Sequence, residues 1–171
     1  MNLIESLNLV TTSLSKECIK HALIGGLALA AHGVVRATVD IDLLIDGDDK
    51  DAVKTVLFNL GFSIFHETDE ILQLSGPAQL DIILANRPLS KNLLNQAKSY
   101  NDFPLPVVSA EGLIGLKIQA YKNDPKRELQ DKADIQALLT QNQNLDFSKI
   151  KEYADLFNEW GFILKTQELI K

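Results

Sequence analysis

The sequence of 171 residues predicts an α+β fold: a β-sheet flanked by helices, with a helical C-terminal tail. Short apolar or alternating runs, which are typical of strands, cluster in the first hundred residues. Runs with helical spacing separate these strands and then dominate the remainder. No internal repeat or long linker divides the chain, so we expect a single domain over residues 1–171. Its α/β core would be residues 1–105, with residues 106–171 packed on that core as a helical part.

The first three elements are a helix, a strand and a short helix. Apolar residues at helical spacing predict a helix over residues 2–17. An apolar run over residues 21–24 ends at two glycines, which indicates a strand entering a tight turn. Alanine and leucine dominate residues 27–32 and predict a short helix that ends at Gly33.

The next elements supply the rest of the sheet. Residues 39–45 alternate apolar and acidic side chains before an Asp-Gly-Asp turn, and this pattern predicts a strand. Residues 50–60 have helical spacing and stop at a glycine. Three apolar runs predict strands over residues 62–66, 71–74 and 80–84, with a Gly-Pro break before the last one.

The last third is more helical. Helical spacing predicts a helix over residues 89–100, and two prolines keep residues 103–106 extended. Capping residues and helical spacing predict the remaining helices over residues 110–122, 126–140, 148–160 and 162–170.

The composition, 46% apolar and 23% charged, indicates a soluble globular protein. A lone cysteine, Cys18, excludes an internal disulfide and a Cys-based zinc site, and it favours a reducing, cytoplasmic compartment. The longest apolar-rich stretch, residues 22–35, is too short to span a bilayer, so no membrane partner is expected. The N-terminus lacks the pattern of a signal peptide. The net charge of −6 disfavours non-specific polynucleotide binding.

The main chemical signal is a set of three aspartates. Asp40 and Asp42 are two apart in a strand, so their carboxylates project from the same face. Asp81 lies in another, otherwise apolar strand. Acidic groups in such strands are costly to bury without a partner. If the two strands are neighbours, the three carboxylates meet and could hold two Mg²⁺ or Mn²⁺ ions, which suit an in-line displacement at phosphorus.

Ordinary alternatives exist for each motif. An Asp-x-Asp pair alone also fits a solvated edge strand or a turn. The adjacent Gly25 and Gly26 fit a tight strand-to-helix turn. They would equally let the backbone approach a phosphate, beside the free N–H groups of a helix N-terminus.

In combination, these motifs resemble the signature of the DNA polymerase beta-like nucleotidyltransferase superfamily. That signature is an apolar residue and a glycine pair, a spacer, and an acid–apolar–acid–apolar strand. Here Ile24-Gly25-Gly26 precedes Asp40-Ile41-Asp42-Leu43 by thirteen residues. Residues 31–42 resemble the branch that contains the AbiEii/AbiGii-type toxins. Residues 113–120 and 127–135 resemble that branch's later helices, although Gln130 stands where the branch has lysine.

The resemblance implies a nucleotidyltransferase-type mixed β-sheet and a role for each matched residue. Asp40, Asp42 and Asp81 would be the metal ligands, with Asp81 also helping to deprotonate the acceptor hydroxyl. The same three aspartates and Lys117 would be catalytic. Nucleotide-binding roles would fall to Gly25, Gly26, Arg36, Thr38 and Lys117.

Structural alternatives apply to the charged residues outside the aspartate set. Lys117 could extend its charge to solvent from an amphipathic helix, and Arg36 could pair with a nearby acid. Asp131 and Asp134 would by default form a solvated or salt-bridged helix face, with Arg127 and Lys132 as partners.

The leading function is a Mg²⁺-dependent transfer of a nucleoside monophosphate from an NTP to an acceptor hydroxyl. The acceptor would be tRNA or another RNA end, a protein side chain or a small molecule. The resemblance also implies a toxin with a cognate antitoxin. The alternative is a catalytically silent protein that binds a nucleotide or a partner on the same fold.

Overall fold

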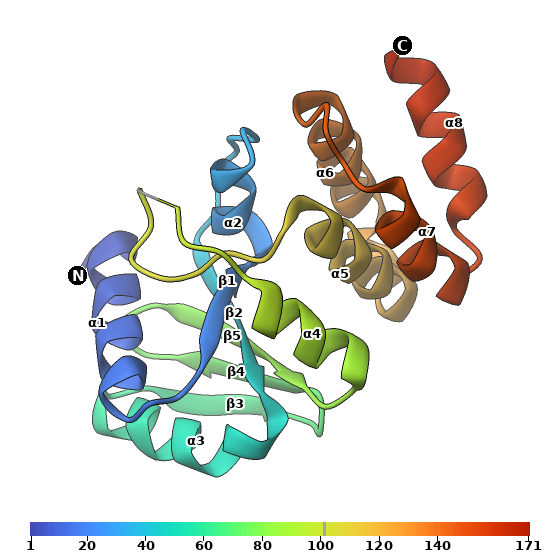
Figure 1. Cartoon of the computed structure of the whole chain (residues 1–171). Coiled ribbons are helices and arrows are strands. Elements are labelled where there is room, and N and C mark those ends of the chain that lie inside the picture. The colour runs from blue at the N-terminus through green and yellow to red at the C-terminus, as the bar shows by residue number, and fades with distance from the viewer. Residues whose placement is uncertain (101) are drawn as a thin grey trace. The chain divides into compact units, whose positions relative to one another are not determined.

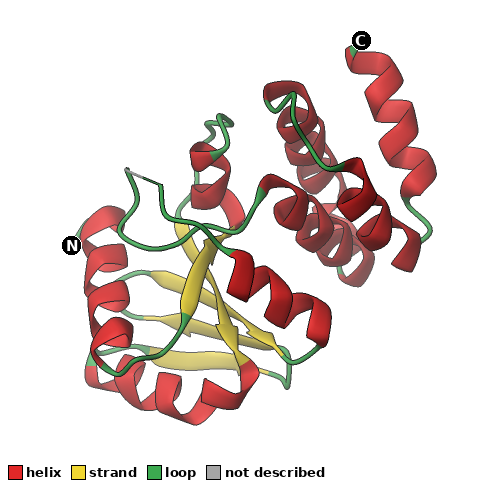
Figure 2. Ribbon diagram, in the orientation of Figure 1, coloured by secondary structure: helices red, strands yellow, loops and turns green. Residues whose placement is uncertain are grey.

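The computed structural model describes residues 1–100 and 102–171. Their contacts form two compact units, which are described separately. The first unit contains Met1–Ala31 and Arg36–Val108, and the second contains His32–Val35 and Ser109–Lys171. The strands of the described residues, yellow in Figure 2, all belong to the first unit.

A five-stranded mixed sheet forms the centre of the first unit (Figure 1). Its strands are β1 His21–Ile24, β2 Asp40–Asp46, β3 Ser63–Glu67, β4 Ile71–Ser75 and β5 Gln79–Ala85. The order across the sheet is β1-β2-β5-β4-β3, in which β2 and β5 run parallel and the other neighbours antiparallel. The predicted α+β fold with a mixed sheet is therefore confirmed.

Among its described residues, four α-helices and one 3₁₀ turn complete the first unit. They are α1 Leu3–Lys16, α2 Gly25–Ala31, η1 Gly47–Asp49, α3 Lys50–Asn59 and α4 Pro88–Gln96. Helix α1 starts with a capping box, because the side chain of Asn2 accepts from the backbone N–H of Glu5 and the side chain of Glu5 accepts from that of Asn2.

One face of the sheet is apolar. Its fully buried side chains alternate along the strands, as they should in a half-covered sheet, and include Ile41, Leu43, Ile45, Leu72, Leu74, Leu80 and Ile82. Residues directly opposite one another on neighbouring strands share a face. Glu67 is opposite Leu72, and two lysines of α3 pair with Glu67, so α3 lies over the apolar face at β3.

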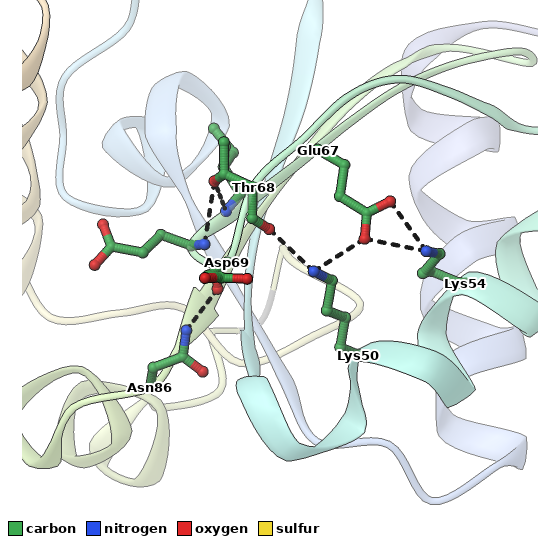
Figure 3. A network of polar contacts seen from close by, with 8 residues as sticks. Lys50, Lys54, Glu67, Thr68, Asp69 and Asn86 are labelled. Carbon is green, nitrogen blue, oxygen red and sulfur yellow. Dashed lines mark hydrogen bonds and ion pairs between the residues drawn. The ribbon is translucent and has the colours of Figure 1, made fainter.

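Figure 3 shows the polar contacts that hold the β3–β4 turn. The Nζ atom of Lys50 lies 2.9 Å from a carboxylate oxygen of Glu67 and donates to the Thr68 carbonyl at 3.0 Å. On the other side of the turn, the Asn86 amide donates to the Asp69 carbonyl at 2.7 Å. These bonds attach the turn to α3 and to the chain that follows β5, so the outer half of the sheet is anchored at this end.

The other face of the sheet is polar over part of its area. Asp40, Asp42 and Asp46 alternate with the buried residues of β2 and therefore share this face. Helix α4 covers the carboxyl end of β2 and β5, because the Nζ atom of Lys91 on α4 lies 3.0 Å from Asp46. The half-buried carboxylates of Asp40 and Asp42 lie nearer the start of the strand.

The second unit is helical. It contains α5 Ala110–Asn123, η2 Pro125–Arg127, α6 Glu128–Gln141, α7 Phe147–Leu156 and α8 Trp160–Ile170. Side chains cap several of these starts: the Ser109 hydroxyl accepts from Gly112, and the Asp124 carboxylate accepts from Lys126. Helices α5 and α7 approach closely at Gly115, where a Cβ atom would lie 2.5 Å from the ring of Tyr153.

Two predicted helix ends are wrong. The helix predicted over residues 89–100 ends at Gln96, because Lys98 exchanges both backbone hydrogen bonds with Val107, at 3.0 and 2.8 Å. The helix predicted over residues 148–160 ends at Leu156. Asn158 then takes a positive φ of 56°, which closes the turn into α8.

Among residues 1–100 and 102–171, none of the helices combines the length and the apolar character that crossing a bilayer would require.

Candidate functional site

The three predicted carboxylates lie on one face of the sheet. Asp42 on β2 is directly opposite Asp81 on β5, and Asp40 is opposite Gln79. Neighbouring strands are about 4.8 Å apart, so the side chains of Asp42 and Asp81 start from adjacent points. All three aspartates are half-buried. The acidic groups therefore project from neighbouring strands to the same side.

Gly25 brings the glycine turn against this acidic face. β1 pairs with β2 so that Ile24 is opposite Asp42, and the chain turns into α2 at Gly25 with a φ of 65°. A Cβ atom at position 25 would lie only 2.0 Å from Oδ2 of Asp42. The residue must be glycine for two reasons, because the left-handed backbone favours it and because the Asp42 carboxylate fills the space.

Gly26 is enclosed by residues of the segment that leads into β2. A Cβ atom at position 26 would lie 2.7 Å from Oγ1 of Thr38 and 3.5 Å from Nη1 of Arg36. The same guanidinium nitrogen donates to the Ala37 carbonyl at 3.0 Å. The structure thus brings four predicted nucleotide-binding residues together in the first unit, namely Gly25, Gly26, Arg36 and Thr38.

Gln73 contacts this site and was missed in the sequence. It lies directly opposite Asp81 on β4, and its amide nitrogen donates to Oδ2 of Asp81 at 3.0 Å. The alternation of β4 indicates that Gln73 faces away from Leu72 and Leu74. The alternation does not indicate which strand lies beside β4. The contact between Gln73 and Asp81 can therefore be found only from the pairing of β4 with β5.

The donor set of the acidic face fits a hard divalent cation. Mg²⁺ prefers carboxylate oxygens, retains several waters and often shares its shell with substrate phosphates. Asp40, Asp42 and Asp81 supply carboxylates from one face of two adjacent strands. Among the described residues, no three His, Cys, Asp or Glu side chains already surround one point that a metal ion could occupy. These aspartates are the residues that would hold the ion as its side-chain ligands.

Lys117 belongs to the second unit, where it is buried in a cluster of charges. Its Nζ atom lies 3.1 Å from Oδ1 of Asp131 and 2.6 Å from Oδ2 of Asp134. Arg127 pairs with Asp131 at 3.1 Å, and the Gln130 amide donates to Asp134 at 2.9 Å. Lys117 is 6% exposed, Asp131 1% and Asp134 3%. Lys117, Asp131 and Asp134 therefore form an ion-pair network shielded from solvent, with Arg127 and Gln130 at its exposed edge.

This arrangement corrects two sequence-based alternatives. Of the two expected arrangements for Asp131 and Asp134, the salt-bridged one is present and the solvated one is not, because Lys117 on α5 pairs with both carboxylates in the interior of the unit. Of the two expected partners, Arg127 pairs with Asp131 at 3.1 Å, and the ammonium of Lys132 pairs with Glu128 at 2.6 Å. Because its ammonium pairs with the buried carboxylates of Asp131 and Asp134, Lys117 does not extend its charge to solvent.

His21 and His66 lie on the two edge strands of the sheet, β1 and β3, and His32 belongs to the second unit. His21, the first residue of β1, is buried against α1. Its Nδ1 atom lies 2.8 Å from the Ile19 carbonyl and its Nε2 atom 3.2 Å from the Thr11 hydroxyl. Burial, which is only partly offset by the bond to Ile19, lowers the pKa of His21 below its ordinary value. The His32 carbonyl accepts from Asn142 within the second unit. His66 is exposed on β3.

Comparison with known proteins identifies one matching family and a set of similar folds. The family model described as nucleotidyl transferase AbiEii toxin, Type IV TA system, matches residues 9–163. No curated protein sequence matched the chain.

Several solved structures share the fold. The antibiotic-resistance factor ANT(2'')-Ia is 16% identical with a TM-score of 0.69, over 98% of this chain and 97% of that chain. The lincosamide antibiotic adenylyltransferase LnuA, solved with lincomycin bound, is 18% identical with a TM-score of 0.60, over 82% and 99%. A nucleotidyltransferase-like protein from Paracoccidioides brasiliensis is 18% identical with a TM-score of 0.57, over 98% and 92%. At these identities the likeness is one of fold.

Proposed function

The chain belongs to the AbiEii nucleotidyltransferase toxin family and is a nucleotidyltransferase, and we propose that it moves a nucleoside monophosphate from an NTP to an acceptor hydroxyl with divalent cations held by Asp40, Asp42 and Asp81. The single observation that carries this proposal is the position of Asp42. Its carboxylate lies directly opposite Asp81 and directly against the glycine turn. Transfer from an NTP requires carboxylate ligands for divalent cations and backbone N–H groups that can bind phosphate, and the position of Asp42 combines the two.

In the proposed reaction, the acceptor oxygen attacks the α-phosphorus of the NTP. The bond from that phosphorus to the oxygen bridging to the β-phosphorus breaks, and pyrophosphate leaves. Asp81 accepts the proton of the acceptor hydroxyl as a general base, a role that requires its carboxylate to lie within hydrogen-bond distance of the attacking oxygen. Divalent cations, when bound, supply a charge that neutralises the phosphates and stabilises the leaving group.

Other residues of the first unit would position the nucleotide. Gly25 and Gly26 lie at the N-terminus of α2, where backbone N–H groups can bind the β- and γ-phosphates. Arg36 offers a planar fork of donors that suits phosphate oxygens, and Thr38 offers a hydroxyl beside it. A nucleotide-binding role for Lys117 remains a separate prediction, since its ammonium pairs with two buried carboxylates.

Three classes of acceptor fit the proposed reaction, and they should be tested together. The ANT(2'')-Ia structure solved with adenylyl-2''-tobramycin and the lincomycin-bound LnuA structure motivate small hydroxylated antibiotics. The family's toxin description motivates RNA ends, including tRNA, and protein side chains. A toxin role also implies a cognate antitoxin, and our proposal includes a cytoplasmic location, where these targets occur.

The test is incubation of the purified protein with each labelled NTP, Mg²⁺ and acceptors from all three classes. We expect label transfer to one class, and we expect Asp42→Ala to abolish it. Asp46→Asn is the matched control, because Asp46 is on the same strand and face but pairs with Lys91 under α4. Transfer that survives Asp42→Ala would contradict the proposal. Binding of an NTP without transfer to any acceptor would favour a catalytically silent binding protein.

The toxin role has its own test. Induced expression of the wild-type chain should arrest bacterial growth, and expression of Asp42→Ala should not. Equal arrest by both proteins would contradict a toxicity that depends on nucleotidyl transfer.

A further inference from the structure

The side-chain amide of Gln73 binds the carboxylate for which the proposed function needs the most exact orientation. Nε2 of Gln73 donates to Oδ2 of Asp81 at 3.0 Å, across the antiparallel pair β4–β5. An ionised carboxylate can only accept hydrogen bonds, so the amide presents its nitrogen to Asp81. A bond between a partly buried amide and a charged group is stronger than one between neutral groups.

Gln73 belongs to a row of side chains that crosses the sheet. Reading from β2 outward, the row is Asp42, Asp81, Gln73 and His66, each directly opposite the next. A bulge at Phe65 brings His66, not Phe65, opposite Gln73. Of the two cross-strand neighbours of Asp81, Asp42 repels its charge and Gln73 donates to it. The row therefore places a neutral hydrogen-bond donor on the side of Asp81 that is away from Asp42.

We propose that Gln73 is a positioning residue for Asp81. The hydrogen bond to one oxygen fixes the rotation of the carboxylate about its Cβ–Cγ bond, in the orientation in which Asp81 acts on the acceptor and holds a cation. Partners of this kind, which orient a ligand without touching the substrate, typically contribute 10–100-fold to activity or metal affinity. This inference rests on the proposed function for its activity and Mn²⁺ readouts, whereas the orientation of the Asp81 carboxylate can be tested without it.

An ordinary structural role for Gln73 makes different predictions. If the amide only satisfied a half-buried charge, its loss would reduce the thermal stability and leave the kinetics of the folded protein unchanged. A leucine at position 73 keeps the approximate size of the side chain and suits an alternating strand, but it cannot donate. A glutamate at position 73 keeps the shape of the glutamine side chain, but its carboxylate can only accept hydrogen bonds and so faces the Asp81 carboxylate without a donor.

The kinetic test compares Gln73→Leu, Gln73→Glu and His66→Ala with the wild type. We expect kcat to fall about 10–100-fold in both Gln73 variants, with the KM for NTP within about 3-fold, because the orientation of Asp81 matters in the transition state rather than in nucleotide binding. His66→Ala is the matched control, since His66 is the other cross-strand neighbour of Gln73 and is exposed; its kcat should not change. Wild-type kcat in Gln73→Leu would overturn the proposal.

Two further measurements do not depend on turnover. Crystal structures of the wild type and Gln73→Leu should show the Asp81 carboxylate in different orientations. Titration with Mn²⁺, followed by electron paramagnetic resonance, should show affinity reduced about 10–100-fold in Gln73→Leu. An unchanged Asp81 orientation would overturn the proposal. If the wild type transfers no nucleotide to any acceptor, the proposed function fails, and the Asp81 orientation still decides the role of Gln73. If Gln73→Leu does not fold, the same structural comparison on Gln73→Glu decides.

Discussion

At the scale of single residues, Gly25 meets two requirements that can be separated. Its φ of 65° is costly for any residue with a Cβ atom, and the missing Cβ leaves room for Oδ2 of Asp42. Gly61 meets only the first, because its φ is 86° and no heavy atom beyond its own and those of its chain neighbours lies within 4 Å of where its Cβ would be. The two glycines therefore form a matched pair.

Gly25→Ala should lose most of its nucleotidyl transfer, while Gly61→Ala should retain it. Backbone strain costs each variant about 1–2 kcal/mol of unfolding free energy. Only Gly25→Ala also displaces the Asp42 carboxylate, because its Cβ atom would lie 2.0 Å from Oδ2. Displacing a catalytic group by about 1 Å lowers kcat about 100-fold. Denaturant unfolding and initial rates measure the two effects. Equal rates in the two variants would show that the contact between Gly25 and Asp42 has no part in the activity.

The charge cluster of the second unit allows a second residue-scale prediction. Lys117→Met leaves Asp131 and Asp134 buried without their shared cation, and breaking a buried pair in this way costs about 3–5 kcal/mol. Lys151→Met is the control, because Lys151 and Asp155 form a half-exposed pair within α7 and should contribute almost nothing. Urea unfolding measures both changes. A Lys117→Met protein as stable as the control variant would contradict the importance of the cluster.

At the scale of elements, the junction between α1 and β1 depends on a neutral histidine. The two ring nitrogens of His21 contact the Ile19 carbonyl and the Thr11 hydroxyl, an arrangement that one neutral tautomer satisfies. Burial lowers its pKa in the folded state below the ordinary 6.5. The unfolded chain therefore binds the proton more readily than the folded chain, and acid favours unfolding at this junction.

The unfolding free energy should thus decrease as the pH falls below about 6.5. The decrease should continue until the pH reaches the lowered pKa of folded His21, below which both states are protonated. Above 6.5 this contribution is fully present. His21→Asn should weaken this pH dependence, and His66→Asn, which changes an exposed ring on β3, should not. Urea unfolding at pH 5.0 and pH 7.5 is the measurement, and an identical pH dependence in the wild type and His21→Asn would contradict the assignment.

Local sequence patterns predicted most helices and strands. They failed to predict features that depend on a segment distant in the sequence. The alternation of β2 and the apolar run of β5 were sufficient to predict strands carrying Asp42 and Asp81. The early end of α4 depends on Val107, and the burial of Asp134 depends on Lys117 from another helix. Gln73 was missed for a related reason, because only the strand order shows that β4 is beside β5. Spacing along the chain carries none of these pairings.

At the scale of the whole molecule, we propose that the two units unfold as one cooperative domain, as the sequence predicted for residues 1–171. Trp160 is the single tryptophan and lies in α8 of the second unit. Its fluorescence reports on that unit, whereas far-UV circular dichroism reports on all helices and strands. The two thermal transitions should coincide, because two-state unfolding gives the same midpoint with every probe. A fluorescence midpoint several degrees away from the dichroism midpoint would show that the units unfold separately.

The route of the chain has a consequence for any attempt to divide the protein. The polypeptide leaves the first unit after Ala31, re-enters it at Arg36 and leaves it again after Val108. Asn142 donates to the His32 carbonyl at 3.1 Å, and so tethers the excursion that links the glycine pair to the acidic strand. A stop codon or protease cut after Val108 would therefore not release an intact half. Loss of the residues after Val108 would remove the Asn142 bond to the segment that joins the glycine pair to β2.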